Sequence, residues 1–208
     1  MTETSVGYDK AFEKLTANTR ETDNIAVFID GYGTLEAAKC LNFRIDWLIF
    51  RDLMNDVARV KLLNVYLSSN IKSDCRKLAD WFMHNGFNVT LTEGESCIYE
   101  QNIEGKVFNK FSYNTGYNIN MATDILSIAN KVDRIFLFTA NKEFASLVLK
   151  LRSDGIPVTV ISNSLNKLRE LKANKKIENI SDVGVDLIRS ASEFVELHDI
   201  HIGIKKEE

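Results

Sequence analysis

Short segments of consecutive apolar residues recur along this chain, and stretches with helical periodicity separate them. The apolar segments are residues 25–29, 62–67, 87–91, 134–138 and 157–161. Most are nearly continuous in Val, Ile, Leu and Phe, which is typical of strands buried on both faces of a parallel sheet. The chain is therefore expected to fold around a sheet that is covered on both faces.

Apolar residues also recur at helical spacing, and these helical segments lie between or after the strands. They are residues 45–60, 74–85, 119–129, 143–153 and a segment that opens at Ser164. Gly86 and Gly155 stand where glycine commonly ends a helix, and Ser164 is a suitable N-cap. Strands that alternate with helices predict an α/β fold with a mainly parallel central sheet. In such folds the functional site lies at the carboxyl ends of the strands.

Residues 96–113 depart from this pattern, because they alternate in polarity around Gly105. They predict an extended excursion or a hairpin at the edge of the sheet. An exposed hairpin offers unpaired backbone groups, so we expect a homodimer.

The length of 208 residues, with one proline and no low-complexity tract, indicates a single domain. We assign residues 24–198 to this domain, residues 1–23 to an N-terminal extension with a frayed start, and residues 199–208 to a charged C-terminal tail. No apolar run approaches the roughly 20 residues that a membrane span needs. The polar N-terminus lacks the pattern of a signal peptide. We therefore expect a cytoplasmic protein with no membrane partner.

Charge and cysteine usage argue against several classes of protein. The net charge of −3 excludes a general coat of positive charge but leaves room for a local basic face. Cys40, Cys75 and Cys97 lack the spacing of a zinc site or a disulfide framework, so we expect three reduced, structural thiols. His198 and His201 could bind a metal together, although an incidental pair is the simpler interpretation.

Polar residues follow the first strand. Asp30-Gly31-Tyr32-Gly33 places a carboxylate at a strand end, with glycines that let backbone approach a ligand. This arrangement suits a divalent cation or a phosphate, and equally an aspartate that stabilises a glycine-rich turn.

The fourth strand is followed by residues 139–144, in which Thr139 and Asn141 are plausible helix caps and Glu143 suits a first helical turn. A helix N-terminus also offers an anion site. Asn118 could cap the preceding helix, and Asp124 suits a solvated helix charge.

The order of these segments resembles the NYN domain, the LabA-like branch of the PIN ribonuclease superfamily. The stretches that carry the resemblance are residues 26–33 (AVFIDGYG), 116–124 (GYNINMATD), 134–144 (RIFLFTANKEF), 151–158 (LRSDGIPV) and 187–197 (LIRSASEFVEL). The resemblance implies a PIN-like αβα sandwich. It also implies that active relatives hold Mg²⁺ or Mn²⁺ in a cluster of aspartates and use it to activate water that cuts RNA.

This chain departs from the family pattern at the acidic positions. Asp30 matches the first aspartate, but Asn118 and Asn141 stand where aspartates are expected, Glu143 replaces another, and Gly33 replaces an asparagine. Asparagine offers a carbonyl oxygen without charge, and hard cations are held largely by carboxylates. We therefore expect weakened metal binding.

The same exchanges remove negative charge from the groove in which phosphates would lie. Aromatic side chains near it could stack on unpaired bases or pack the predicted hairpin: Tyr32, Phe108, Phe111, Tyr113 and Tyr117. A basic stretch within residues 163–176 could contact phosphates or form an ordinary solvated helix face. The residues expected to contact RNA are Tyr32, Asn118, Asn141, Lys142, Lys167, Arg169 and Lys172.

These observations predict a protein that binds RNA, in single-stranded form, on a degenerate nuclease fold and needs no cofactor for binding. The alternative is an endoribonuclease dependent on Mg²⁺ or Mn²⁺, with Asp30, Asp124 and Glu143 as catalytic residues and Asp30 and Glu143 as metal ligands. A third possibility is a protein-interaction domain that no longer touches nucleic acid.

Overall fold

The structure is a computed structural model, and it describes residues 3–69, 75–103, 106–114, 116–173 and 184–207. Its centre is a six-stranded sheet in which every pair of neighbouring strands is parallel. The spatial order is β3 (Asn88–Thr92), β2 (Arg59–Ser68), β1 (Asn24–Asp30), β6 (Arg134–Phe138), β7 (Val158–Ser162) and β8 (Glu193–Glu196). The five predicted strands are present, and the α/β fold with a parallel sheet is confirmed.

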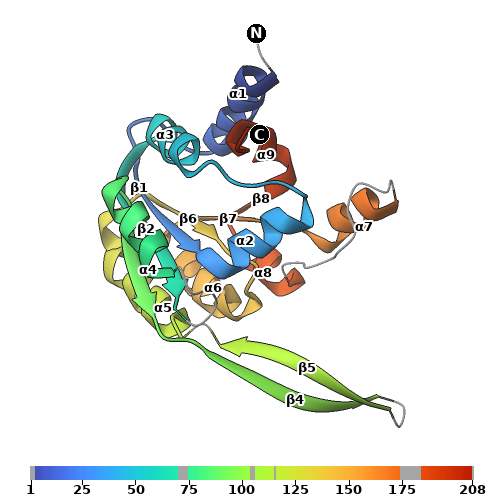
Figure 1. The fold of residues 1–208 in the computed structure, drawn as a ribbon. Coiled ribbons are helices and arrows are strands. Elements are labelled where there is room, and N and C mark those ends of the chain that lie inside the picture. The colour runs from blue at the N-terminus through green and yellow to red at the C-terminus, as the bar shows by residue number, and fades with distance from the viewer. Residues whose placement is uncertain (1–2, 70–74, 104–105, 115, 174–183, 208) are drawn as a thin grey trace.

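Helices lie on both faces of this sheet (Figure 1). The core of one face is shared by α1 (Glu3–Thr16), α2 (Gly31–Cys40), α3 (Trp47–Val57), α4 (Cys75–His84) and α9 (Leu197–Ile204). The core of the other is shared by α5 (Asn118–Ile128), α6 (Ala145–Ser153) and α8 (Val185–Ser190). The three layers are those of the expected αβα sandwich. The remaining helix, α7 (Leu165–Ala173), packs Leu168 and Leu171 against Cys40 and Leu41 at the end of α2.

The predicted helices occur as α3, α4, α5, α6 and α7, with shifted ends. Gly86 and Gly155 adopt φ angles of 85° and 82°, the left-handed conformation that commonly follows a helix. The Oγ atom of Ser164 accepts a hydrogen bond of 3.2 Å from the backbone N–H of Lys167. The capping signals in the sequence therefore mark real helix ends.

Successive side chains of β1 point to opposite faces of the sheet, and this alternation determines the face toward which the last residue of the strand points. Ile25, Val27 and Ile29 belong to the core beneath α2 and α3, whereas Ala26 and Phe28 belong to the core beneath α5. The same alternation turns the side chain of Asp30 toward the α5 face.

The expectation of a frayed N-terminal segment is wrong for residues 3–16. They form α1, which lies along α9, so that the two ends of the chain meet (Figure 1). A Cβ atom on Gly7 would collide with Ile202, and one on Gly203 would collide with Gly7 and Ala11. The two glycines thus allow the helices to approach closely, and this contact between distant segments leaves no local periodic signal.

The predicted hairpin exists, but it does not join the edge of the central sheet. β4 (Glu95–Ile103) and β5 (Lys106–Asn114) form their own antiparallel pair. Figure 1 shows the pair as a long arm that projects from the body of the molecule. The sequence also made predictions for four side chains of this arm, and these lie outside the described part: Cys97, Phe108, Phe111 and Tyr113.

Among the described helices none is long and apolar enough to cross a membrane. Cys40 and Cys75 are both buried, as structural thiols should be.

Candidate functional site

The carboxyl ends of β1 and β6 meet the first residues of α5 and of η2 (Lys142–Phe144) at one edge of the sheet. Asp30 ends β1 and is the N-cap of α2. Its Oδ1 atom accepts a hydrogen bond of 2.9 Å from the backbone N–H of Gly33. Such a cap satisfies one of the unpaired N–H groups at a helix start. The glycine-rich-turn interpretation of Asp30 is thus supported by the geometry.

Two side chains add further hydrogen bonds to the same carboxylate. The hydroxyl of Tyr117 donates to Oδ1 at 2.6 Å, and the hydroxyl of Thr139 donates to Oδ2 at 2.7 Å. Asp30 is only 4% exposed. Its buried negative charge is therefore stabilised by three neutral donors of the protein itself, which is how an interior carboxylate avoids an uncompensated desolvation cost.

Tyr117 links Asp30 to the following turn. Its hydroxyl also accepts a hydrogen bond of 3.2 Å from the backbone N–H of Tyr32, and its ring lies against that of Tyr66, with centroids 5.9 Å apart. Tyr117 is fully buried. The expectation that its ring could stack on a base is therefore wrong. Tyr32, by contrast, is 39% exposed at this edge.

Asn118, Asn141 and Glu143 form a second cluster beside the first. Glu143 Oε2 accepts from Asn118 Nδ2 at 3.0 Å and from Asn141 Nδ2 at 3.3 Å. Asn141 also caps η2, because its Oδ1 accepts from the backbone N–H of Glu143 at 3.0 Å. Asn118 does not cap α5, whose N-cap is Tyr117. The structure thus brings three of the sequence-predicted residues into direct contact.

Thr139 connects the two clusters. Its Oγ1 atom donates to Asp30 and accepts from the backbone N–H of Asn141 at 3.0 Å. The end of β1 and the η2 turn are therefore held in one hydrogen-bonded network.

Asp124 takes part in a separate interaction. Its Oδ2 atom accepts from the hydroxyl of Tyr66 at 2.7 Å, and Tyr66 in turn accepts from Asn64 Nδ2 at 2.8 Å. Burial, and then the hydrogen bond to Asp124, raise the pKa of Tyr66. Asp124 thus fastens α5 to β2 and is more than the solvated helix charge considered from the sequence.

The oxygen atoms at this edge do not fit a Mg²⁺ or Mn²⁺ ion. Such ions require several convergent oxygens, chiefly carboxylates. Here the carboxylates of Asp30, Glu143 and Asp124 are each engaged by protein donors. Within the described ranges, no three His, Cys, Asp or Glu side chains are grouped so that they could hold a metal. The geometry therefore supports no step through a bound ion.

Cations lie near the cluster and on α7. Lys142 is exposed beside Glu143 and passes over Gly184, where a Cβ would collide with it. Lys167 pairs with Glu170 at 3.4 Å. Arg169 and Lys172 are exposed on α7. Asn163 is fully buried, with its Nδ2 atom donating to Ala37 O at 2.8 Å, so its assignment to the basic surface is wrong.

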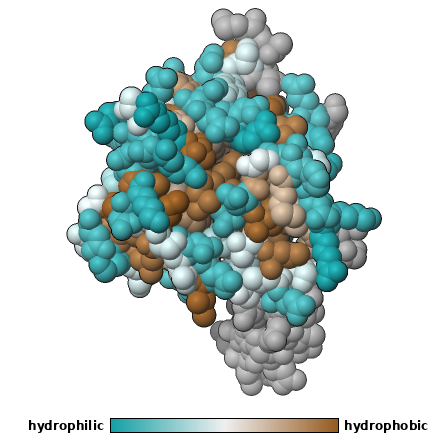
Figure 2. All heavy atoms as spheres, turned by 90° about the vertical axis from the view of Figure 1, so that its left-hand side faces the viewer, coloured by the Kyte–Doolittle hydropathy of each residue, from teal (hydrophilic) through white to brown (hydrophobic). Residues whose placement is uncertain are grey.

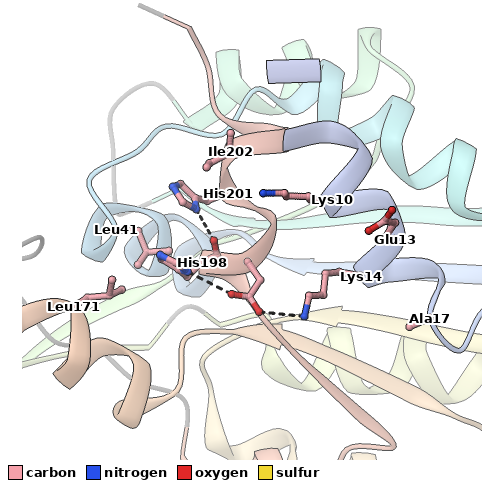
Figure 3. Close-up of a pocket in the computed structure, with 10 residues that line it drawn as sticks. Lys10, Glu13, Lys14, Ala17, Leu41, Leu171, His198, His201 and Ile202 are labelled. Atoms are coloured by element: carbon pink, nitrogen blue, oxygen red, sulfur yellow. Dashed lines mark hydrogen bonds and ion pairs between the residues drawn. The ribbon is translucent and has the colours of Figure 1, made fainter. Parts of the chain in front are cut away.

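The histidine pair lies in a pocket of about 750 Å³ between α1 and α9 (Figure 3). The Nδ1 atom of His201 faces the carbonyl of His198, and that of His198 faces Asp199. Burial is the main cause that lowers the pKa of His201. Lys14 also approaches Asp199, at 3.6 Å. The ion pair between Lys14 and Asp199 thus joins α1 to α9 beside the histidines.

The sequence pointed to Asp30, Asn118, Asn141 and Glu143 but missed what Tyr117 and Thr139 do. A tyrosine directly before Asn118, and a glycine at position 33, were the available signals. A Cβ on Gly33 would collide with the Asp30 carboxylate, so the glycine permits the capped conformation. The pairing of these positions depends on strand order, which a single sequence does not reveal.

Comparison with known proteins agrees with this architecture. Among solved structures, a protein of unknown function from Vibrio parahaemolyticus superposes with a TM-score of 0.59 at 19% identity, covering 86% of this chain and 96% of that one. That similarity shows the fold alone. No protein of curated function matches. The NYN domain family matches residues 24–196. The chain therefore belongs to the NYN domain family and has its PIN-like nuclease fold.

Proposed function

We propose that this protein binds RNA on a nuclease fold whose hydrolytic centre is degenerate. The observation that carries the proposal is the state of Asp30, whose buried carboxylate is held by Gly33, Tyr117 and Thr139. The family resemblance gives this residue a metal-binding role in active relatives. Here its oxygens serve the protein's own hydrogen bonds.

The second cluster supports the same proposal. Two neutral amides, Asn118 and Asn141, stand where carboxylates are expected, and both donate to Glu143. Without converging negative charge, the field that lowers the pKa of a metal-bound water is lost. The same loss reduces repulsion of a phosphate backbone, which favours binding over cleavage.

We assign RNA contacts to the exposed and half-buried groups at this edge. Tyr32 offers a ring for stacking, Lys142 offers a cation, and the clustered amides of Asn118 and Asn141 offer polar atoms. Arg169 and Lys172 on α7 would extend the path for phosphates. NYN domains generally bind RNA, and membership of that family supports the assignment.

Fluorescence anisotropy with a labelled single-stranded RNA tests the proposal. Binding should weaken as salt is raised, because phosphate contacts release counterions. Lys142→Glu should weaken binding and lower the salt slope by about one or more. Lys131→Glu is the matched control, since Lys131 is exposed in η1 (Ala129–Lys131), before β6 and thus at the opposite end of that strand. No RNA binding at low salt would overturn the proposal.

A further inference from the structure

A hollow of about 450 Å³ lies over β2 between α2, α3 and α4, and we call it the apolar slot. Val65 and Leu67 of β2 line it, together with Leu35 of α2 and Trp81 of α4. Figure 2 shows hydrophobic side chains gathered near the middle of the face that carries α3 and α4. Trp81 is 40% exposed. The slot is therefore an apolar surface that the described chain leaves open to solvent.

Aromatic rings give the slot a fixed shape. Trp47, at the start of α3, packs edge-on against Phe82 with ring centroids 5.2 Å apart, and Trp81 packs edge-on against Phe82 at 5.3 Å. The sequence contains only two tryptophans, so both of them line this one hollow. A rigid aromatic lining with one exposed ring suits a planar ligand that stacks.

Positive charge gathers at one end of the slot. Ile45 pairs with Lys205 in an isolated bridge, and the backbone N–H of Lys206 donates to Arg44 O at 2.7 Å, so these two cationic residues are neighbours. Both line the slot. Asp46 also lines the slot and keeps its negative charge while it caps α3 by accepting from Leu48 and Ile49. Arg44 and Lys206 together outweigh this charge, so this end of the slot can receive an anion.

The slot reaches the edge of the sheet that carries the candidate site. Gly31, which lines it, directly follows Asp30, and Leu67 lies near the carboxyl end of β2. Asp30 faces α5, whereas the slot lies on the α2 and α4 face, so the start of α2 stands between them. A polynucleotide that crosses this edge of the sheet could contact both the slot and the candidate site around Asp30.

We propose that the apolar slot holds a base of a bound single-stranded RNA, stacked on Trp81, with an adjacent phosphate on Arg44 and Lys206. This inference rests on the proposed function and adds a second contact site to it. The slot reaches the edge of the sheet that Asp30 occupies, and the neighbouring cations Arg44 and Lys206 lie at one end of it. These two features favour a polynucleotide over an acidic protein segment as the occupant.

Tryptophan fluorescence tests the inference directly, because both tryptophans of the chain line the slot. Unlabelled oligouridine should change the emission over the same concentrations at which labelled oligouridine gains anisotropy. Trp81→Ala should weaken binding about tenfold, and Trp81→Phe should restore most of it, since a phenyl ring still stacks. Arg44→Glu should weaken binding and reduce its salt dependence. Leu149→Ala, at an exposed apolar residue of α6, should have no effect.

The outcomes separate the two proposals. RNA that binds by anisotropy without changing the emission, and with equal affinity for Trp81→Ala, overturns the slot and leaves the proposed function standing. Absence of any RNA binding overturns both. An emission change with an acidic amphipathic helical peptide, but none with oligouridine, would make the slot a protein-docking surface and overturn the inference.

Discussion

The hydroxyl of Tyr117 lies 2.6 Å from Oδ1 of Asp30, and both side chains are buried at the carboxyl edge of the sheet. This hydrogen bond joins the start of α5 to the end of β1. It uses an oxygen of the acidic side chain on which the family's metal chemistry would depend. The proposal of a degenerate centre is therefore supported by contacts as well as by the two asparagines.

Removing this hydroxyl should cost stability. Tyr117→Phe leaves a buried carboxylate short of one donor, so the free energy of unfolding should fall by about 2 kcal/mol. Denaturant unfolding measures the change. Tyr8→Phe is the control, because it removes a tyrosine–aspartate hydrogen bond, to Asp56, that is exposed, and it should cost no more than about 0.5 kcal/mol. Equal losses of unfolding free energy in the two variants would show that the buried hydrogen bond to Asp30 stabilises the protein no more than the exposed one does.

Restoring the missing acids should create an ion site. Asn118→Asp combined with Asn141→Asp places two new carboxylates against Glu143, so repulsion should lower the thermal midpoint in chelator. Mn²⁺ should then raise that midpoint, while leaving the wild type and the surface control Asn130→Asp unchanged. A comparable rise in the wild type would mean that the present side chains already hold the ion.

Gly33→Asn, which introduces the family's residue, should destabilise the protein. The new Cβ would collide with the Asp30 carboxylate and disturb the α2 cap, at an expected cost of about 1–3 kcal/mol. Gly155→Asn provides the comparison for backbone strain without a collision, since nothing lies within 4 Å there and asparagine accepts the left-handed φ of 82° better than most side chains. A Gly33 variant as stable as the Gly155 variant would contradict the collision.

Acid should weaken the contact between α1 and α9. Burial lowers the pKa of His201 below its ordinary value of 6.5, so the unfolded chain takes up a proton before the folded one does. The resulting loss of unfolding free energy is absent above pH 6.5 and grows as the pH falls below that value. His201→Gln should therefore flatten the loss of unfolding free energy over this range, whereas His84→Gln, on α4, should not. Parallel pH curves for both variants would contradict the role given to His201.

Local patterns in the sequence predicted the parallel sheet, because apolar runs and capping residues act over a few neighbours. β8 escaped prediction because a four-residue edge strand with two glutamates has too little apolar periodicity. The α1–α9 contact escaped because it joins the two ends of the chain through Gly7 and Gly203. Such features depend on tertiary contacts that no short window contains.

The candidate site, like the fold, was predictable from the sequence only in part. Asp30 was recognisable because it matches the acidic pattern of the family, and Asn118 and Asn141 were recognisable because they depart from it. For Tyr117 the sequence left base stacking and packing of the hairpin open, because its burial depends on how α5 packs against β1 and β2. Asp124 was expected as a solvated helix charge or, in the enzyme alternative, as a catalytic residue, and only the fold shows its hydrogen bond from Tyr66.

The central claim is that RNA binds here and is not cut. Labelled single-stranded RNA should be incubated with the protein in Mn²⁺, at concentrations where anisotropy shows the RNA to be bound, and then resolved by size. We predict intact RNA for the wild type and for Asp30→Asn alike. Cleavage that requires Mn²⁺, occurs with the wild type and disappears with Asp30→Asn would contradict the account.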